Sequence, residues 1–79
     1  MLEEALEHLV KGIVDHPEAV QVRERDLRRG RVLQVRVYPG DLGRVIGRGG
    51  RTASALRTVL GALSGGRAVR VDFLDVDER

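Results

Sequence analysis

Three glycines and two arginines gather in the middle of the chain, within residues 45–53 (Val-Ile-Gly-Arg-Gly-Gly-Arg-Thr-Ala). Glycine permits positive φ angles and has no side chain to stop another backbone from approaching closely. The first N–H groups of a helix carry partial positive charge, and Arg48 and Arg51 would place full charges beside them. If a helix begins directly after the glycines, the turn is suited to holding phosphate.

Apolar residues on both sides of this turn have helical spacing. They are Leu42, Val45 and Ile46 before the turn, and Ala53, Leu56, Leu60 and Leu63 after it. The pattern predicts two helices joined by a tight turn. Asp41, which follows Pro39-Gly40, is expected to cap the first of them. The stretch Ser64-Gly65-Gly66 is expected to end the second.

The first third of the chain predicts another helix. Apolar residues from Leu2 to Ile13 recur on one helical face, and acidic residues occupy the other. The helix should end near Asp15-His16-Pro17, because the residue before a proline is pushed out of the helical region. His16 then marks a boundary between elements rather than a site.

Three strands are predicted from alternating apolar and polar residues. The first begins at Val20 and Val22, and the second carries Leu33, Val35 and Val37. The intervening Arg28-Arg29-Gly30 supplies a turn, so the two should form an antiparallel hairpin with one buried face. The third strand contains Val69, Val71 and Phe73, and residues 75–79 should form a polar, frayed tail.

The net charge of +2 hides an uneven distribution. Residues 1–22 hold five acids and one lysine, residues 23–70 hold twelve arginines and three acids, and residues 71–79 hold four acids and one arginine. The basic block contains the glycine turn. This clustering favours a polyanion as partner over a general contribution to solubility.

Length and composition set further bounds. Seventy-nine residues suffice for one domain with one small core, so residues 1–79 are expected to form a single domain. The absence of cysteine excludes disulfides and thiolate metal sites. The sequence shows no signal peptide and no apolar run long enough to span a bilayer. We therefore expect a cytoplasmic location and no membrane contact.

The run from Val45 to Gly50, followed by Ala53 and Leu56, resembles the Val-Ile-Gly-x-x-Gly core of KH domains, which bind single-stranded nucleic acid. The predicted order helix, strand, strand, helix, helix, strand resembles the bacterial type II form of that fold. Within the family the chain is similar to the small stand-alone bacterial KH proteins of the KhpA type. The stretch from Asp15 to Val20 adds to this likeness.

The resemblance implies an α+β fold with a three-stranded mixed sheet and three helices on one face. It also implies a site for single-stranded RNA. On this basis the backbone of the RNA would lie on a Gly-x-x-Gly loop, with an apolar floor under the bases. The expected RNA-binding residues are Arg44, Val45, Ile46, Gly47, Arg48, Gly49, Gly50 and Arg51. The resemblance further implies action in RNA metabolism or as an RNA chaperone, beside a second KH-containing RNA-binding protein.

Several side chains near this site have two interpretations. Arg44 can converge on phosphate with Arg48 and Arg51, or it can lie on a solvated helix face. Arg57, two turns into the following helix, is expected to be solvated. Tyr38 can stack on a base or cap the hairpin, whereas Phe73 is expected on the buried strand face.

Ala53 departs from the family pattern, which has a larger aliphatic residue there. With only two aromatic residues in the chain, an aromatic stacking platform is not expected. Binding should instead depend on backbone contacts and base-edge hydrogen bonds.

Two other kinds of binding protein fit parts of the sequence. A helix-hairpin-helix binder of duplex DNA shares an apolar-Gly-x-Gly turn, matched by Ile46 to Gly49, but its position between the glycines is normally apolar and here is Arg48. A protein-interaction module without RNA binding is the second. The acidic first helix could dock on the basic centre of another copy, which makes a homodimer conceivable.

An enzyme is not expected. The Walker A pattern fails, because Gly43 is followed at the required position by Arg48 and Gly49 rather than by lysine and a hydroxyl residue. The dinucleotide pattern fails because position 52 is threonine. His8 and His16 have no nucleophile or metal partner at a suggestive spacing. We therefore assign no catalytic residue, no metal ligand and no cofactor.

Overall fold

The computed structural model describes residues 2–28, 30–65 and 69–76. Its helices and strands follow one another in the order α-β-β-α-α-β, as expected. They are α1 (Leu2–Lys11), β1 (Gln21–Leu27), β2 (Gly30–Val37), α2 (Leu42–Ile46), α3 (Arg51–Leu63) and β3 (Val69–Asp75). Short 3-10 turns occupy Pro17–Ala19, Pro39–Asp41 and Arg48–Gly50. Among the described residues, no helix is long and apolar enough to cross a membrane.

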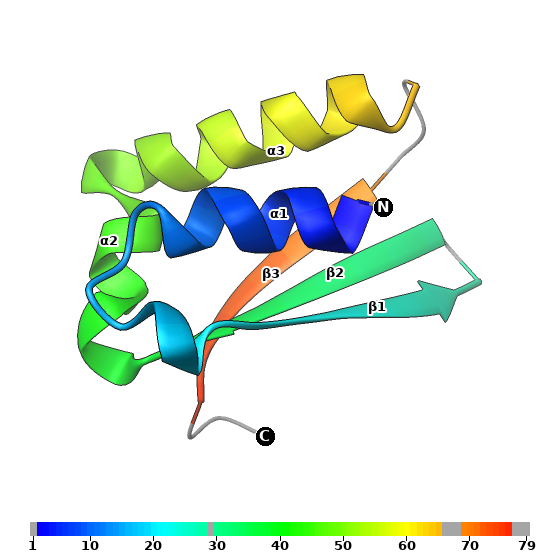
Figure 1. The fold of residues 1–79 in the computed structure, drawn as a ribbon. Coiled ribbons are helices and arrows are strands. Elements are labelled where there is room, and N and C mark those ends of the chain that lie inside the picture. The colour runs from blue at the N-terminus through cyan, green and yellow to red at the C-terminus, as the bar shows by residue number, and fades with distance from the viewer. Residues whose placement is uncertain (1, 29, 66–68, 77–79) are drawn as a thin grey trace.

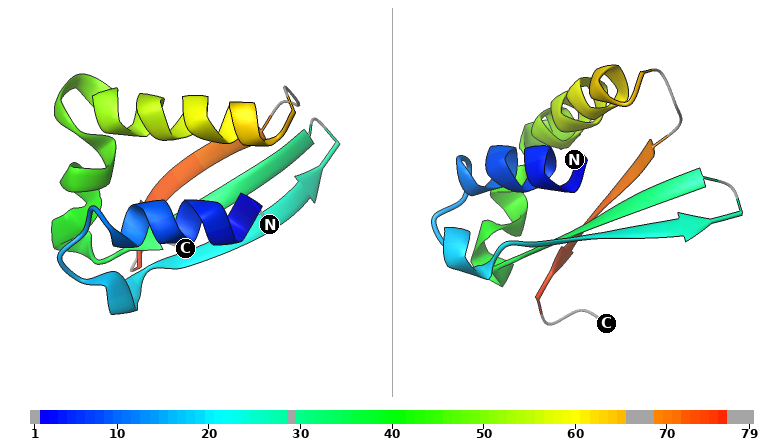
Figure 2. Two further views of the ribbon diagram at one scale, coloured as in Figure 1. Left: turned by 45° about the horizontal axis from the view of Figure 1, so that its top comes forward. Right: turned by 45° about the vertical axis from the view of Figure 1, so that its right-hand side comes forward.

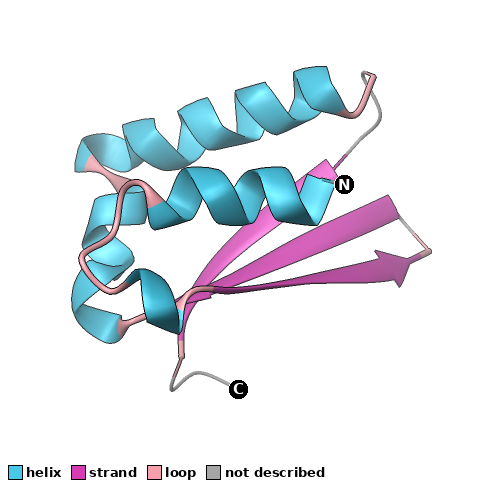
Figure 3. Cartoon of the chain, in the orientation of Figure 1, coloured by secondary structure: helices cyan, strands magenta, loops and turns pink. Residues whose placement is uncertain are grey.

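The three strands form one mixed sheet in the order β1-β2-β3 (Figures 1 and 3). β1 and β2 are antiparallel, with Val22 opposite Val35. β2 and β3 are parallel, with Val35 opposite Phe73, because the chain returns through α2 and α3 before it adds the third strand. The predicted α+β fold with a three-stranded mixed sheet is confirmed.

The three helices cover one face of this sheet (Figure 2). α1 packs on β1, while α2 and α3 pack on β3 and on one another. Alternate residues of the strands point into this layer and close the core with the apolar faces of the helices. The core consists of Leu6, Val10, Val14, Val20, Leu33, Val35, Val37, Val45, Leu56, Leu60 and Val71.

The other face of the sheet carries no helix (Figure 2). The register places nine side chains on this open face, in three rows across the strands. The rows are Arg25, Val32 and Arg70; Arg23, Gln34 and Asp72; and Gln21, Arg36 and Leu74. Val32 is buried, yet it does not belong to the core cluster, as expected for a residue on this side.

Several predicted boundaries were wrong. The first helix ends at Lys11 rather than near Asp15, since Gly12 and Ile13 turn away while their N–H groups still bond to carbonyls of the last helical turn. Val20 precedes β1 instead of beginning it. Asp75 belongs to β3 rather than to a frayed tail, and the N–H of Val76 donates to the carbonyl oxygen of Val37 at 2.8 Å.

Other predicted features lie partly outside the described residues. Arg29 of the hairpin turn and Gly66 of the stretch after α3 are not described, and the same holds for residues 77–79 of the predicted tail. Their described neighbours agree with the predictions in part. Gly30, which was predicted in the turn, is the first residue of β2 and pairs with Leu27, whereas α3 ends at Leu63 as predicted.

Candidate nucleic-acid interface

The glycine turn joins α2 to α3, as the sequence predicted. Residues Arg48–Gly50 form a single 3-10 turn, closed by a hydrogen bond from the Gly50 N–H to the Gly47 carbonyl oxygen at 3.1 Å. No side chain caps the start of α3 at Gly50. The turn therefore presents the backbone of its glycines, with the exposed side chain of Arg48 between Gly47 and Gly49, at the positive end of a 13-residue helix.

Two glycines of the turn have different roles. Gly47 has φ 77° and ψ 170°, and a Cβ atom built there would lie 2.8 Å from both Cβ and the backbone nitrogen of Thr52. Gly49 has φ 63° and ψ 20°, and a Cβ atom there would meet nothing within 4 Å. Gly47 is thus required by the packing of the turn, whereas the space over Gly49 is free for a ligand.

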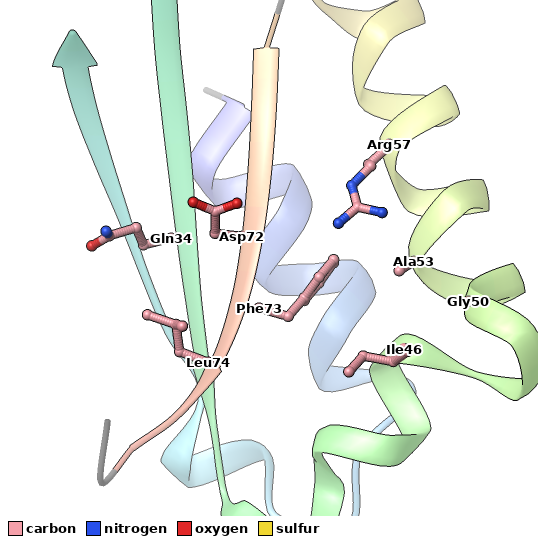
Figure 4. Close-up of a pocket in the computed structure, with 8 residues that line it drawn as sticks. All are labelled: Gln34, Ile46, Gly50, Ala53, Arg57, Asp72, Phe73 and Leu74. Atoms are coloured by element: carbon pink, nitrogen blue, oxygen red, sulfur yellow. The ribbon is translucent and has the colours of Figure 1, made fainter. Parts of the chain in front are cut away.

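A groove of about 440 Å³ lies beside the turn (Figure 4). It is lined by Gln34, Ile46, Gly50, Ala53, Arg57, Asp72, Phe73 and Leu74. Two of the predicted site residues, Ile46 and Gly50, are among these. Ile46 is 38% exposed, so an apolar side chain is available to a base at the mouth of the groove. The small Ala53 forms the wall next to it.

Arg57 and Phe73 face one another across the groove (Figure 4). The guanidinium carbon of Arg57 lies 5.5 Å from the centre of the Phe73 ring, and its Nη2 donates to the carbonyl oxygen of Val71 at 3.1 Å. Arg57 is exposed, as predicted, but these contacts of its guanidinium were not foreseen. Phe73 lies on the predicted strand face but is only partly buried, because the groove opens over it.

The predicted arginines do not all converge. Arg48 and Arg51 are exposed on the turn, and within the described part of the chain neither forms an ion pair. Arg44 instead directs its Nη2 to the Oδ2 atom of Asp15 at 3.1 Å. Both groups of that pair are more than half exposed, so the pair leaves Arg44 able to exchange partners.

Val45 was expected in the apolar floor of the site, but its side chain is fully buried in the core. Helical spacing explains the difference. Consecutive residues of a helix point in directions about 100° apart, so Val45 and Ile46 cannot both face the groove. Val45 fixes α2 on the sheet, and Ile46 remains as the apolar side chain that a base can reach.

Asp41 stands directly before α2, yet it does not cap that helix. Its Oδ2 accepts hydrogen bonds from the His16 backbone N–H at 2.9 Å and from the His16 ring Nδ1 at 3.0 Å. Burial acts to raise the pKa of Asp41, but the bonds from His16 and the backbone of Asp15 prevail, and the pKa is lowered. His16 also stacks on Tyr38, with ring centres 4.0 Å apart.

This cluster was not foreseen from the sequence, because His16 and Asp41 are 25 residues apart. It ties the connection after α1 to the start of α2, and thereby positions the element that carries the glycine turn. Tyr38 is occupied by the histidine ring, which argues against its use as a base-stacking platform. Among the described residues, no group of three acidic, histidine or cysteine side chains could hold a metal ion.

The arrangement can bind an extended polyanion. The turn offers backbone N–H groups to phosphate, together with two guanidinium groups that form no ion pair with any described residue. The adjacent groove offers Ile46 and Phe73 to a flat apolar ring. The polar atoms of Gln34, Asp72 and Arg57 at its rim can form hydrogen bonds with base edges.

Comparison with known proteins gives a consistent result. The sequence model of the family described as KhpA/KhpB, KH domain, matches residues 3–73. The chain is 77% identical over 77 residues to the RNA-binding protein KhpA of Streptomyces coelicolor, covering 98% of this chain and 96% of that protein. The protein of the same name from Mycobacterium tuberculosis is 57% identical over 75 residues, covering 95% and 92%. That of Halalkalibacterium halodurans is 43% identical over 72 residues, covering 89% and 95%.

Proposed function

The chain belongs to the KhpA/KhpB family of KH domains, and from this we propose that it binds single-stranded RNA in the groove beside its glycine turn. The observation that carries the proposal is the juxtaposition of two features. A turn with free space over Gly49, and with two arginines that form no ion pair among the described residues, adjoins a groove with an exposed apolar floor. The relatives are named RNA-binding proteins, which supports RNA as the ligand.

In the proposed complex the sugar-phosphate backbone lies along Arg48, Gly49, Gly50 and Arg51. About four nucleotides fit such a groove. Ile46 contacts a base directly, and Val45 acts only by holding α2 in place. Arg44 joins the phosphate contacts when it leaves Asp15, at little cost for an exposed pair.

Arg57 and Phe73 belong to the proposed binding residues as well. A guanidinium plane over an aromatic ring provides a flat surface on which a base can stack, and its outward N–H groups can reach base carbonyl groups. The site thus gains a stacking surface that the sparse aromatic content did not predict. It is formed by one arginine and one phenylalanine from different elements.

Competition binding tests the choice of polymer. A labelled RNA tetranucleotide bound to the protein should be displaced by unlabelled single-stranded RNA at lower nucleotide concentration than by duplex DNA, since the groove takes splayed bases and not a stacked pair. Duplex DNA at the same nucleotide concentration tests the alternative of a helix-hairpin-helix protein, which would bind the duplex. Equal displacement by both polymers would contradict binding in the groove.

We further propose that the domain associates with a second KH domain, either a copy of itself or a related protein. The apolar residues Val59 and Leu63 lie about one helical turn apart on α3, and both are exposed. A pair of domains would extend a site that holds about four nucleotides. Sedimentation of the parent and of V59E/L63E tests this. The parent should dimerise and the variant should not, and an unassociated parent at high concentration would refute self-pairing.

If the protein binds cellular RNA, we expect it in the bacterial cytoplasm, because RNA is made and translated there. The proposed role, as an RNA chaperone or as part of a larger RNA-binding assembly, rests on the same RNA site. It requires only that the domain bind unpaired segments with loose sequence preference, which is what backbone contacts at a glycine turn provide.

A further inference from the structure

The open face of the sheet carries an excess of positive charge. It carries the arginines Arg23, Arg25, Arg36 and Arg70, opposed by a single acid, Asp72. Arg70 and Asp72 pair with each other, with Nε 3.0 Å from Oδ1. In the described part of the chain, Arg23, Arg25 and Arg36 have no acidic partner. Three guanidinium groups on one flat surface thus remain uncompensated.

Charged groups elsewhere on the surface are arranged differently. Lys11 pairs with Glu7 at 2.9 Å, Arg31 with Glu24 at 3.1 Å, and Arg44 with Asp15 at 3.1 Å. The helix side of the domain therefore pairs many of its charges within the chain, whereas the open face largely does not. Unpaired arginines that lie together attract an anion with spaced charges.

Two polar atoms of the central strand also lack partners. Gln34 Oε1 and Arg36 Nε are covered from solvent, and neither has a hydrogen-bond partner among the described residues. An acceptor and a donor left unpaired on adjacent rows are costly to the free protein. A ligand that carries both donors and acceptors, such as ribose hydroxyl and phosphate groups, can satisfy both when the side chains turn outward.

The open face is continuous with the groove. In Figure 4, Ile46, Ala53, Arg57 and Phe73 lie on one side of β3, and Gln34, Asp72 and Leu74 lie on the other. β3 is an edge strand, so no further strand blocks the passage between the two sides. A bound RNA strand that leaves the groove over β3 would next reach Gln34 and Arg36 on β2. It would then reach Arg23 on β1, about 10 Å from β3.

We infer that the open face of the sheet is a second binding surface for single-stranded RNA, which takes the phosphates of nucleotides that leave the groove over β3. The inference rests on the proposed function of the groove and extends its RNA path. Arg23, Arg25 and Arg36 contact phosphate there, and Gln34 marks the crossing from one surface to the other. A short RNA fills the groove alone, and a longer RNA occupies both surfaces.

The test compares two RNA lengths in one set of variants. RNA of about 4 nucleotides fits the groove, and RNA of about 12 nucleotides, three times that length, can also reach the open face. The variant R23Q/R25Q removes two exposed charges and breaks no ion pair of the described residues. The control K11Q/R31Q removes the same net charge from residues off the open face. Arg36 is left unchanged because it is half buried.

The parent should bind the longer RNA more tightly than the short one. R23Q/R25Q should bind the short RNA as the parent does, but lose about 25-fold in affinity for the longer RNA at 0.1 M salt, from about 0.7 in log-log slope for each of two phosphates. Its salt slope for the longer RNA should fall by roughly 1.4. K11Q/R31Q should lose far less than R23Q/R25Q.

Failure of the inference differs from failure of the proposed function. If the parent binds the short RNA and R23Q/R25Q binds the longer RNA like the parent, the open face is not an RNA surface and the groove proposal stands. If both double variants lose the same affinity, net charge alone accounts for the effect and the inference is overturned. Absence of short-RNA binding by the parent would overturn the groove proposal itself.

Discussion

An added methyl group should have very different effects at Gly47 and Gly49, although the two glycines belong to one turn. At Gly47 the new Cβ would lie 2.8 Å from Cβ and N of Thr52, while at Gly49 it would meet nothing within 4 Å. The backbone at Gly47, with φ 77° and ψ 170°, is in a region nearly exclusive to glycine. Gly49, with φ 63° and ψ 20°, is in the left-handed helical region.

The expected magnitudes follow from these surroundings. Gly49→Ala should cost about 1–2 kcal/mol, the usual penalty for a left-handed residue with a Cβ. Gly47→Ala carries a backbone penalty of about 1–3 kcal/mol, and overpacking against Thr52 adds about 1–3 kcal/mol. For a domain of this size 1 kcal/mol corresponds to about 4–8 °C in Tm. The Gly47 variant should therefore melt on the order of 10–20 °C below the Gly49 variant.

Thermal and urea unfolding followed by circular dichroism measures both variants under one set of conditions. Gly43→Ala is the matched control, because it adds the same group within α2, where nothing lies within 4 Å and φ is not positive. It should be neutral or slightly stabilising. Equal destabilisation by the Gly47 and Gly49 variants would refute the reasoning, since it would show that Thr52 and the turn adjust without cost.

Two further predictions concern Asp41 and Arg57. The lowered pKa of Asp41 means that its hydrogen bonds stabilise the fold above its ordinary pKa of 3.8, and that this stabilisation is lost as the pH falls through the folded-state value. Asp41→Asn should therefore lower Tm at pH 7, with a gap to the parent that closes below pH 3.8; a constant gap would contradict this. Arg57→Gln should weaken binding of short RNA several-fold by fluorescence anisotropy and leave the fold intact. Unchanged affinity would show that its guanidinium only covers Phe73.

The elements of the fold could be predicted because each is encoded by local periodicity. Residues 51–63 repeat apolar side chains at helical spacing, and the observed α3 has the same bounds. The strands alternate, and their hydrophobic faces fix which side meets the helices. The end of α1 was misplaced because Ile13 and Val14 continue the apolar pattern after Gly12 has turned the chain. Val14 is buried by packing on other elements, which periodicity alone cannot distinguish from burial within a helix.

The glycine turn could also be predicted, because its residues are consecutive. The rest of the site could not, because its members come from separate elements. Arg57 meets Phe73 from 16 positions earlier in the chain, and Gln34 enters the groove only because β3 pairs with β2. Asp41 was assigned to the nearest helix end, yet His16, which is distant in sequence, supplies the donors that hold it.

The central claim is that the glycine turn itself holds the RNA backbone, and one pair of variants tests it most directly. R48D/G49D places two anions where phosphate should lie, while R48N/G49N has nearly the same shape without the charge. Both should remain folded, because position 48 is exposed and position 49 has free space and a left-handed backbone conformation that Asn and Asp adopt more readily than Ala.

The measurement is the affinity for a single-stranded RNA tetranucleotide as a function of salt, with Tm recorded for each protein. The parent should show a log-log slope of roughly −1.4 to −2.8, for two to four phosphates at about 0.7 each. R48N/G49N should bind more weakly than the parent, and R48D/G49D should lose both the affinity and most of the slope while its Tm stays close to that of R48N/G49N. Parental binding by a folded R48D/G49D would contradict the account, and the glycine turn would then be only a connector between α2 and α3.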